Sequence, residues 1–190
     1  EKNMGAFYTA LKEQVKSGDF NFQGYVFPGD FSWRALDVKE LVDANFWETQ
    51  FKGDVSFNRT IFKGGANFSG AQFEGDAYFG GAQFKGDAYF RETQFKGWAN
   101  FNKAQFEGYT SFGGTQFKGD AYFWEAIFEG NASFYKAQFE GNASFGGAQF
   151  KGDASFWEAQ FKGNAYFRET QFKGRANFSG AIFHGVGPLH

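Results

Sequence analysis

Apolar and polar positions alternate over short distances through most of this chain. From Thr49 onward the sequence falls into rows of eleven residues that read, with few exceptions, [AT]-Q-F-[KE]-G-x-A-x-F-x-x. The third position is phenylalanine in every row, from Phe51 to Phe183, and the ninth position is phenylalanine in every complete row. The spacing between successive phenylalanines therefore alternates between six and five residues. Neither spacing matches an α-helical period. The pattern therefore predicts short extended segments separated by corners.

Each half-row has the alternation of a single short strand. Ala71 and Phe73 are expected to point inward, while Gln72 and Glu74 are expected to point outward. The glycine at the fifth position follows directly, and glycine accepts backbone angles that other residues resist. We therefore expect this glycine to permit the turn at the corner.

The spacing of the large apolar residues predicts the size of one coil. Upstream, the spacing is five throughout, and four such steps make a coil of twenty residues; the positions are Phe31, Leu36, Leu41, Phe46 and Phe51. Downstream, two fives and two sixes make a coil of twenty-two residues, which is two rows. We interpret the extra residue, such as Asp54 or Asp76, as a wider corner after every second strand. An eleven-residue coil is the alternative, but two phenylalanine columns leave too little room inside it.

The repeated motif A-x-F-x-G, as in Ala82–Gly86, resembles the pentapeptide-repeat family in its phenylalanine-rich variant with an eleven-residue period. The resemblance covers about residues 31–185. It implies an all-β fold, a right-handed quadrilateral β-helix of about 20–22 residues per coil. In that fold the central phenylalanine and the small residue two positions before it both point inward.

The N-terminal segment predicts a short capping helix. Phe7, Leu11 and Val15 recur every four residues within 4–16, which places them on one helical face, and Ser17-Gly18 ends the helix. We expect 1–18 to cap a single β-helix domain of residues 19–190. The other end has no such helix after His184. Either the chain is a fragment, or two such ends stack as a homodimer.

Composition and charge limit the classes of partner that we expect this chain to bind. The 21 acidic and 19 basic residues give a net charge of -2, so neither a basic stripe for nucleic acid nor a dense acidic face is present. No apolar run reaches the ~20 residues of a membrane span. The absence of cysteine excludes disulfides and thiolate metal sites. We expect neither nucleic-acid nor membrane binding; the compartment is undetermined, with the cytoplasm as default.

Candidate chemistry is sparse. The only histidines, His184 and His190, lie near one end, and the carboxylates lie on a periodic exterior. A catalytic site needs partners that converge in a cleft, which a straight rod does not supply. We expect no enzyme, no catalytic residues, no metal ligands and no cofactor.

Two surface features are candidate contact sites. Residues two rows apart stack, so glutamines form one column, and Tyr135 and Trp157 lie one coil apart. The column is either a stability ladder of amides or a flat polar docking strip. The aromatic residues form either a small apolar patch or isolated corner residues. The candidate interaction surface comprises Gln72, Gln94, Gln116, Gln138, Tyr135 and Trp157.

These observations favour a non-catalytic structural or protein-interaction scaffold with a protein partner of unknown identity. The resemblance also implies an alternative, a topoisomerase (DNA gyrase) modulator that acts by DNA mimicry. The near-neutral charge disfavours that alternative, because such mimicry relies on a strongly acidic surface.

Overall fold

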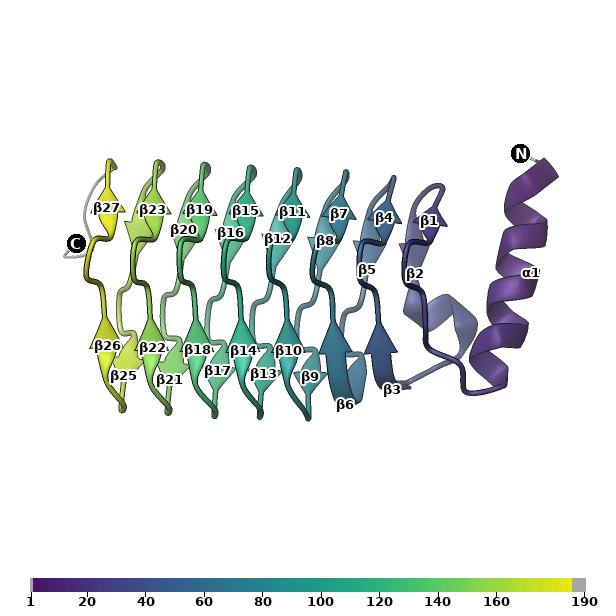
Figure 1. The fold of residues 1–190 in the computed structure, drawn as a ribbon, viewed down its shortest axis with the longest axis horizontal. Coiled ribbons are helices and arrows are strands. Elements are labelled where there is room, and N and C mark those ends of the chain that lie inside the picture. Colours follow the sequence, from purple (N-terminus) through teal and green to yellow (C-terminus); the bar gives the residue numbers. More distant parts are fainter. Residues whose placement is uncertain (1, 186–190) are drawn as a thin grey trace.

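The computed structural model describes residues 2–185 as a parallel β-solenoid of about seven turns. One helix, α1 (Lys2–Lys16), lies across the N-terminal end of the stack (Figure 1). Each regular turn passes through four very short strands, and every strand pairs in parallel with its counterparts one turn away. The predicted fold class, an all-β solenoid with a short N-terminal helix, is confirmed.

Three sheets run along the rod, and the largest bends around a corner through β6. The first contains β1 (Val26–Phe27), β4 (Gln50–Phe51), β7 (Gln72–Phe73), β11 (Gln94–Phe95), β15 (Gln116–Phe117), β19 (Gln138–Phe139), β23 (Gln160–Phe161) and β27 (Ile182–Phe183). The second contains β2 (Phe31–Ser32), β5 (Val55–Ser56), β8 (Ala77–Tyr78), β12 (Ala99–Asn100), β16 (Ala121–Tyr122), β20 (Ala143–Ser144) and β24 (Ala165–Tyr166). The third contains β3 (Glu40–Asn45), β6 (Ile61–Asn67), β9 (Gln83–Phe84), β13 (Gln105–Phe106), β17 (Ile127–Phe128), β21 (Gln149–Phe150) and β25 (Gln171–Phe172), and, beyond the bend, β10 (Ala88–Tyr89), β14 (Thr110–Ser111), β18 (Ala132–Ser133), β22 (Ala154–Ser155) and β26 (Ala176–Asn177).

The strand register gives the length of a turn. Gln94 pairs with Gln72 on one side and with Gln116 on the other, so one regular turn takes two rows of the repeat. A coil of one row is thereby excluded. The first turn is longer still, because Phe27 pairs with Phe51 and Phe31 pairs with Val55, each two positions further along the chain than in a regular turn. The expected shorter upstream coil, built from a constant spacing of five, is wrong.

Stacked phenylalanine rings fill the interior. The Phe117 ring is completely buried and lies 5.2 Å from the Phe95 ring below and 4.8 Å from the Phe139 ring above, both nearly parallel. Its edge contacts Phe123 from the next corner at 6.0 Å and 84°. Stacked contacts along each column and edge contacts between columns are both favourable aromatic geometries. This packing explains why phenylalanine recurs at the central inward position of each half-row.

The fifth-position glycine is needed for a different reason from the one predicted. Gly119 does not have a positive φ; instead, a Cβ placed there would lie 2.4 Å from the carbonyl oxygen of Gly97, one turn below. Apart from Gly64, which lies within β6 and has φ 89°, positive φ in the repeat occurs at the other corners, where glycine is optional: Gly81 has φ 64°, and Lys103 has φ 57° at the equivalent place one turn later. Close approach of successive turns therefore selects glycine at the fifth position.

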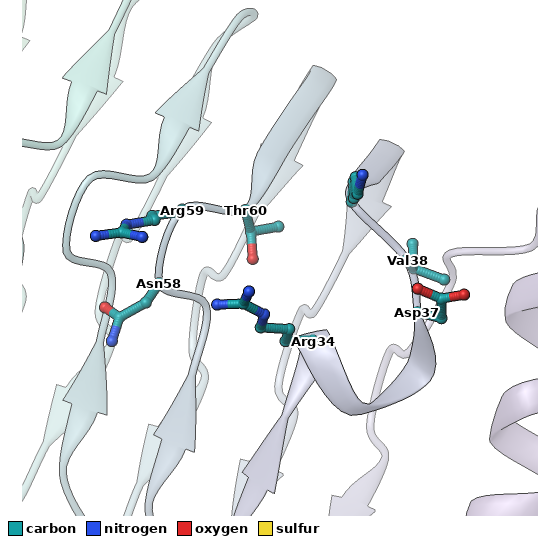
Figure 2. A pocket seen from close by; sticks show the side chains of 7 residues that line it. Arg34, Asp37, Val38, Asn58, Arg59 and Thr60 are labelled. Carbon is teal, nitrogen blue, oxygen red and sulfur yellow. The ribbon is translucent and has the colours of Figure 1, made fainter.

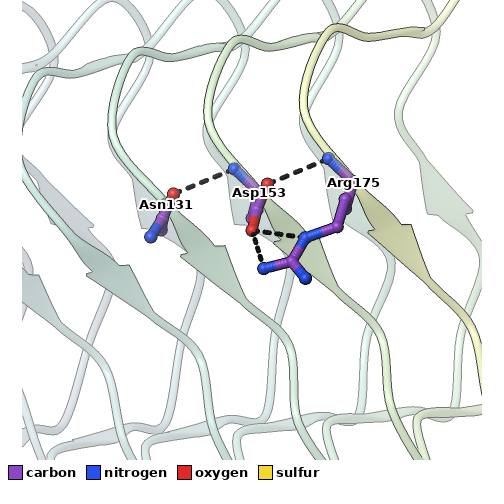
Figure 3. A network of polar contacts seen from close by, with 3 residues as sticks. All are labelled: Asn131, Asp153 and Arg175. Atoms are coloured by element: carbon purple, nitrogen blue, oxygen red, sulfur yellow. Dashed lines mark hydrogen bonds and ion pairs between the residues drawn. The ribbon is translucent and has the colours of Figure 1, made fainter.

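The extra residue of the wider corner has a bonding role. The carboxylate of Asp153 accepts the backbone N–H of Arg175 at 2.9 Å, and the side-chain oxygen of Asn131 accepts the N–H of Asp153 at 2.9 Å (Figure 3). The same bond joins Asp54 to the N–H of Asp76 on the opposite side. Since these N–H groups lie outside the strands, the side chains satisfy donors that the sheets leave unpaired.

Threonine at the small inward position adds a buried bond between turns. The completely buried Thr93 hydroxyl donates to the carbonyl oxygen of Phe68 at 2.8 Å. We expect Thr93→Val, which keeps the shape and removes the donor, to lower the free energy of unfolding by ~1 kcal/mol. Chemical denaturation measures this loss. Most equivalent positions hold alanine, so the fold does not depend on this bond. An unchanged denaturation midpoint for Thr93→Val would contradict a stabilising role for it.

The N-terminal helix covers the first turn as predicted. Leu11 and Val15 are buried, the Phe7 ring contacts the Phe27 ring at 5.4 Å, and the Tyr8 ring stacks on Phe31 at 5.6 Å. Burial is the main cause that raises the pKa of the Tyr8 hydroxyl, and the charge of Asp30 adds to it. The helix therefore continues the hydrophobic column. The division into a cap and a separate domain stays a prediction.

The opposite end of the described chain is the turn formed by β24 to β27, each of which pairs on one side only. The four phenylalanines of this turn are only partly buried: Phe167, Phe172, Phe178 and Phe183. The prediction that no cap follows His184 concerns residues 186–190, which lie outside the described residues. Stacking of two such ends as a homodimer stays a prediction, and the oligomeric state in solution tests it.

Candidate interaction surface

The glutamines of the candidate surface lie in one straight column. Register pairs Gln72 with Gln94, Gln94 with Gln116, and Gln116 with Gln138, along β7, β11, β15 and β19. Their side chains are half-buried on the outer face of the first sheet. Within residues 2–185 no hydrogen bond joins these amide side chains, so the ladder of amides is wrong. Backbone bonds such as Gln116 N–H to the Thr93 carbonyl connect the turns, at 2.9 Å.

The two aromatic residues of the candidate surface contact each other. The rings of Tyr135 and Trp157 lie 5.2 Å apart at 41°, and Trp157 is 47% exposed. The ammonium group of Lys136 lies 4.9 Å from the centre of the Tyr135 ring and 3.4 Å from the carboxylate of Glu158. Contact with Tyr135, followed by the charge of Glu158, raises the pKa of Lys136. The pair is a patch and not two isolated corner residues.

The corner that carries this pair adjoins the glutamine column. Tyr135 comes three residues before Gln138 in β19, and Trp157 comes three residues before Gln160 in β23. Along the same corner, backbone bonds connect the turns of Gly113, Tyr135, Trp157 and Ser179 in that order; they join Gly114 to Tyr135, Lys136 to Trp157 and Glu158 to Ser179. The aromatic pair is thus flanked by two small residues, while amides extend from it along the adjacent face.

Charges of both signs occur along the outer faces, and several of them pair between turns. The ammonium of Lys96 lies 2.7 Å from the carboxylate of Glu74, and Lys52 approaches the same group at 3.9 Å from the other side. The hydrogen bond from Lys96 is the main cause that lowers the pKa of Glu74. These pairs are exposed and contribute little stability. They partly neutralise a column that carries both signs of charge, so it has no continuous acidic face.

The described chain offers little for catalysis or metal binding. Between residues 2 and 185, no group of three or more histidine, cysteine, aspartate or glutamate side chains could hold a metal ion. The aspartates at the wider corners already have partners: Asp76 accepts the Trp98 N–H at 2.8 Å and the Tyr78 hydroxyl at 3.1 Å, and the latter bond raises the pKa of Tyr78. His184 is exposed, and His190 lies outside the described residues.

Among the described residues, no helix has both the length and the apolar character that a membrane span needs.

A second polar surface was missed by sequence reasoning. Arg34 and Arg59 line one pocket beside the first turn, although their separation in the sequence is longer than one regular turn. The signal that could have revealed it is the irregular stretch between Phe31 and Leu41, which includes Trp33 and which the spacing of five passes over.

Comparison with known proteins agrees with this geometry. None of the curated proteins compared with the chain matches it. The family model described as pentapeptide repeats (9 copies) matches residues 43–83, 68–116, 112–160 and 149–189. Those ranges cover all the regular turns, and the family suggests a repeat scaffold of a kind that is typically non-catalytic. On the repeat, the four-strand turn and this match together, the chain belongs to the pentapeptide-repeat family.

Proposed function

We propose that this protein is a non-catalytic scaffold that binds a protein partner through the Tyr135–Trp157 corner and the adjoining glutamine column. The observation that carries the proposal is the contact between two large, partly exposed aromatic side chains on adjacent turns of one corner. Tyrosine and tryptophan are enriched among the residues that dominate binding energy at protein interfaces. Their amphipathic rings supply contact area, and neighbouring polar groups supply specificity.

The rod supports such a site by holding it rigid. The turn that bears Tyr135 is hydrogen-bonded to the turns on both sides, and the Phe134 ring beneath it stacks on Phe112 at 4.9 Å and on Phe156 at 4.7 Å. A rigid surface loses little conformational entropy on binding. The amides of Gln116 and Gln138 make no side-chain bonds within the described chain, so their donors and acceptors are available to a partner.

DNA mimicry, the alternative function, has less support. It requires a continuous acidic face, and the columns of this chain place lysine next to glutamate, as in Lys52–Glu74 and Lys151–Glu129. A modulator of this kind stays the second candidate only through family membership.

The proposal is tested by removing the aromatic pair while keeping the fold. We expect Tyr135→Ser combined with Trp157→Ser to abolish capture of one saturable partner from lysate of the source organism, as measured by quantitative mass spectrometry. The matched control is Trp124→Ser, because Trp124 is 46% exposed and also has a lysine, Lys103, over its ring at 5.1 Å. The control should retain the partner.

Both variants should keep the thermal midpoint of the parent, since the altered side chains are outside the core. Equal capture by the double variant and the parent would contradict the proposed corner. Recovery of topoisomerase subunits by all variants would favour the alternative function.

A further inference from the structure

The first turn of the solenoid departs from the repeat at one corner. Ser32 pairs with Ser56, and Glu40 pairs with Ile61. Between these two paired positions the first turn therefore advances eight residues, from Ser32 to Glu40, while the second advances five, from Ser56 to Ile61. The additional length forms a short 3-10 helix, η1 (Trp33–Leu36), followed by Asp37 with φ 58°. Trp33 fills the interior at this level and stacks on Phe57 at 5.5 Å. The exposed side of η1, which carries Arg34, faces away from that interior.

This departure creates a pocket of about 340 Å³ between η1 and the turn above it. Its walls come from both turns: Arg34, Asp37, Val38, Lys39, Asn58, Arg59 and Thr60 (Figure 2). A volume of this size is at the lower end of the range for small-molecule sites, and it exceeds that of one phosphate group.

The cations of the pocket have no acidic partner. Elsewhere on the rod many lysines pair with a glutamate one turn away, as Lys63 pairs with Glu40 at 3.1 Å. In the part of the chain that the structure describes, no ion pair involves Arg34, Lys39 or Arg59. These three cations face one carboxylate, that of Asp37, in a chain whose net charge is -2. The pocket is therefore a local concentration of unneutralised positive charge.

A hydroxyl in the same pocket also lacks its usual partner. Thr60 is only 5% exposed, and it occupies the same repeat position as Thr93, which donates to the Phe68 carbonyl at 2.8 Å. The corresponding carbonyl for Thr60 would be that of Trp33, which is the first residue of η1. Among residues 2–185 the Thr60 hydroxyl has no hydrogen-bond partner. The hydroxyl oxygen itself is accessible from the pocket, so it is available to donate a hydrogen bond to a ligand.

The remaining polar wall also presents a donor. The side-chain oxygen of Asn58 accepts the Gly80 N–H at 2.7 Å, which leaves its amide NH₂ group free to donate. Figure 2 shows the Arg34 side chain extending from η1 toward Asn58 and Thr60. Arg59 lies between these two residues, on the turn opposite η1. The Arg34 guanidinium, an amide and a hydroxyl thus line one pocket, and Arg59 adds a positive charge beside it, with its side chain extending toward the next turn.

We propose that this pocket binds the phosphate group of a small molecule. Guanidinium groups match the planar pairs of oxygens that phosphate presents, and charge-assisted bonds of this kind are the stronger ones in proteins. The hydroxyl of Thr60 and the amide of Asn58 supply neutral donors to the remaining oxygens. The space beyond one phosphate, with Val38 on its wall, accommodates the carbon portion of a phosphate monoester. This site is independent of the Tyr135–Trp157 corner.

Titration of the ¹⁵N-labelled chain at low ionic strength tests the proposal, with inorganic phosphate and with phenyl phosphate as probes. We expect saturable shifts of the backbone amides of Asn58, Arg59 and Thr60. Arg34→Gln should raise the dissociation constant about tenfold or more, since it removes a charge-assisted bond, and Arg59→Gln, which removes a nearby positive charge, should raise it less than Arg34→Gln but more than the control below. Arg168→Gln is the charge-matched control on the same corner column, and it should change the constant by less than about twofold.

A matched pair of threonine variants separates binding from folding. Thr60→Val should weaken phosphate binding and leave the denaturation midpoint unchanged, while Thr93→Val should lower the midpoint and leave binding unchanged. Tighter binding of phenyl phosphate than of inorganic phosphate would identify a phosphate ester as the ligand, and equal binding would identify free phosphate. Shifts that do not saturate, that sodium chloride reproduces, or that all three arginine variants reduce equally would overturn the proposal.

Discussion

Phe117→Ala should lower the free energy of unfolding by ~3–5 kcal/mol, the loss typical of removing a fully buried aromatic ring. The ring is completely buried, between Phe95 and Phe139 in its own column and beside Phe123 from the next. Strands two residues long cannot shift inward without breaking the register with both neighbouring turns, so the cavity should persist. Equilibrium denaturation in guanidinium chloride measures the loss.

Two further variants make this result specific. Gln116→Ala alters the adjacent, outward-facing residue of β15 and should change stability by less than about 1 kcal/mol, as surface substitutions do. Phe183→Ala removes the last ring of the same column, which stacks on one side only among the described residues, on Phe161 at 4.7 Å, and it should cost less than Phe117→Ala. If Phe117→Ala costs no more than Gln116→Ala, stacking is not what holds the rod together.

The repeated part of the fold could be predicted because one environment recurs. Phe73, Phe95 and Phe117 each meet the same neighbours one turn away, so their spacing reports both the inward direction and the length of a turn. The helix over the first turn was predictable for a related reason, since Leu11 and Val15 occupy one face. Periodic burial leaves a periodic sequence.

The first turn could not be predicted in this way. Phe31, Leu36 and Leu41 keep a spacing of five, and all three are buried, yet Leu36 belongs to η1 and not to a strand. Trp33 takes the inward place at this level, and the longer corner follows from it. A single irregular turn has no second copy in the sequence against which its register can be read.

The candidate surface was predictable in its positions but not in its bonds. The period of two rows placed Tyr135 beside Trp157, and the rings do contact each other. The same period stacked the glutamines, but their backbone groups alone bond between turns, because stacked positions do not determine side-chain rotamers. The pocket that Arg34 and Arg59 share could not be predicted, because the enlarged first turn separates them in the sequence by more than the regular period.

Gly119→Ala should lower the free energy of unfolding by ~1–3 kcal/mol, although alanine is ordinarily the less costly residue in an ordered chain. The added methyl group would lie 2.4 Å from the carbonyl oxygen of Gly97 and 3.1 Å from the backbone nitrogen of Trp98. Backbone atoms of a paired turn cannot move aside as a flexible side chain does. The control is Gly65→Ala, where a Cβ would meet only the Asp43 carboxylate at 4.0 Å, and there we expect no loss.

Replacement by asparagine distinguishes close approach from backbone conformation as the cause. Asparagine tolerates the left-handed region better than alanine does. If Gly119 were selected for its backbone angles, Gly119→Asn would cost less than Gly119→Ala; because the turns approach too closely, the larger side chain should cost at least as much. Gly81 has φ 64°, and a Cβ there would lie 3.6 Å from its nearest neighbour, the Arg59 Cγ atom. At this position Gly81→Asn should therefore cost less stability than Gly81→Ala. Denaturation of these four variants measures both orders, and the same order at both corners would mean that one property of glycine serves the whole solenoid.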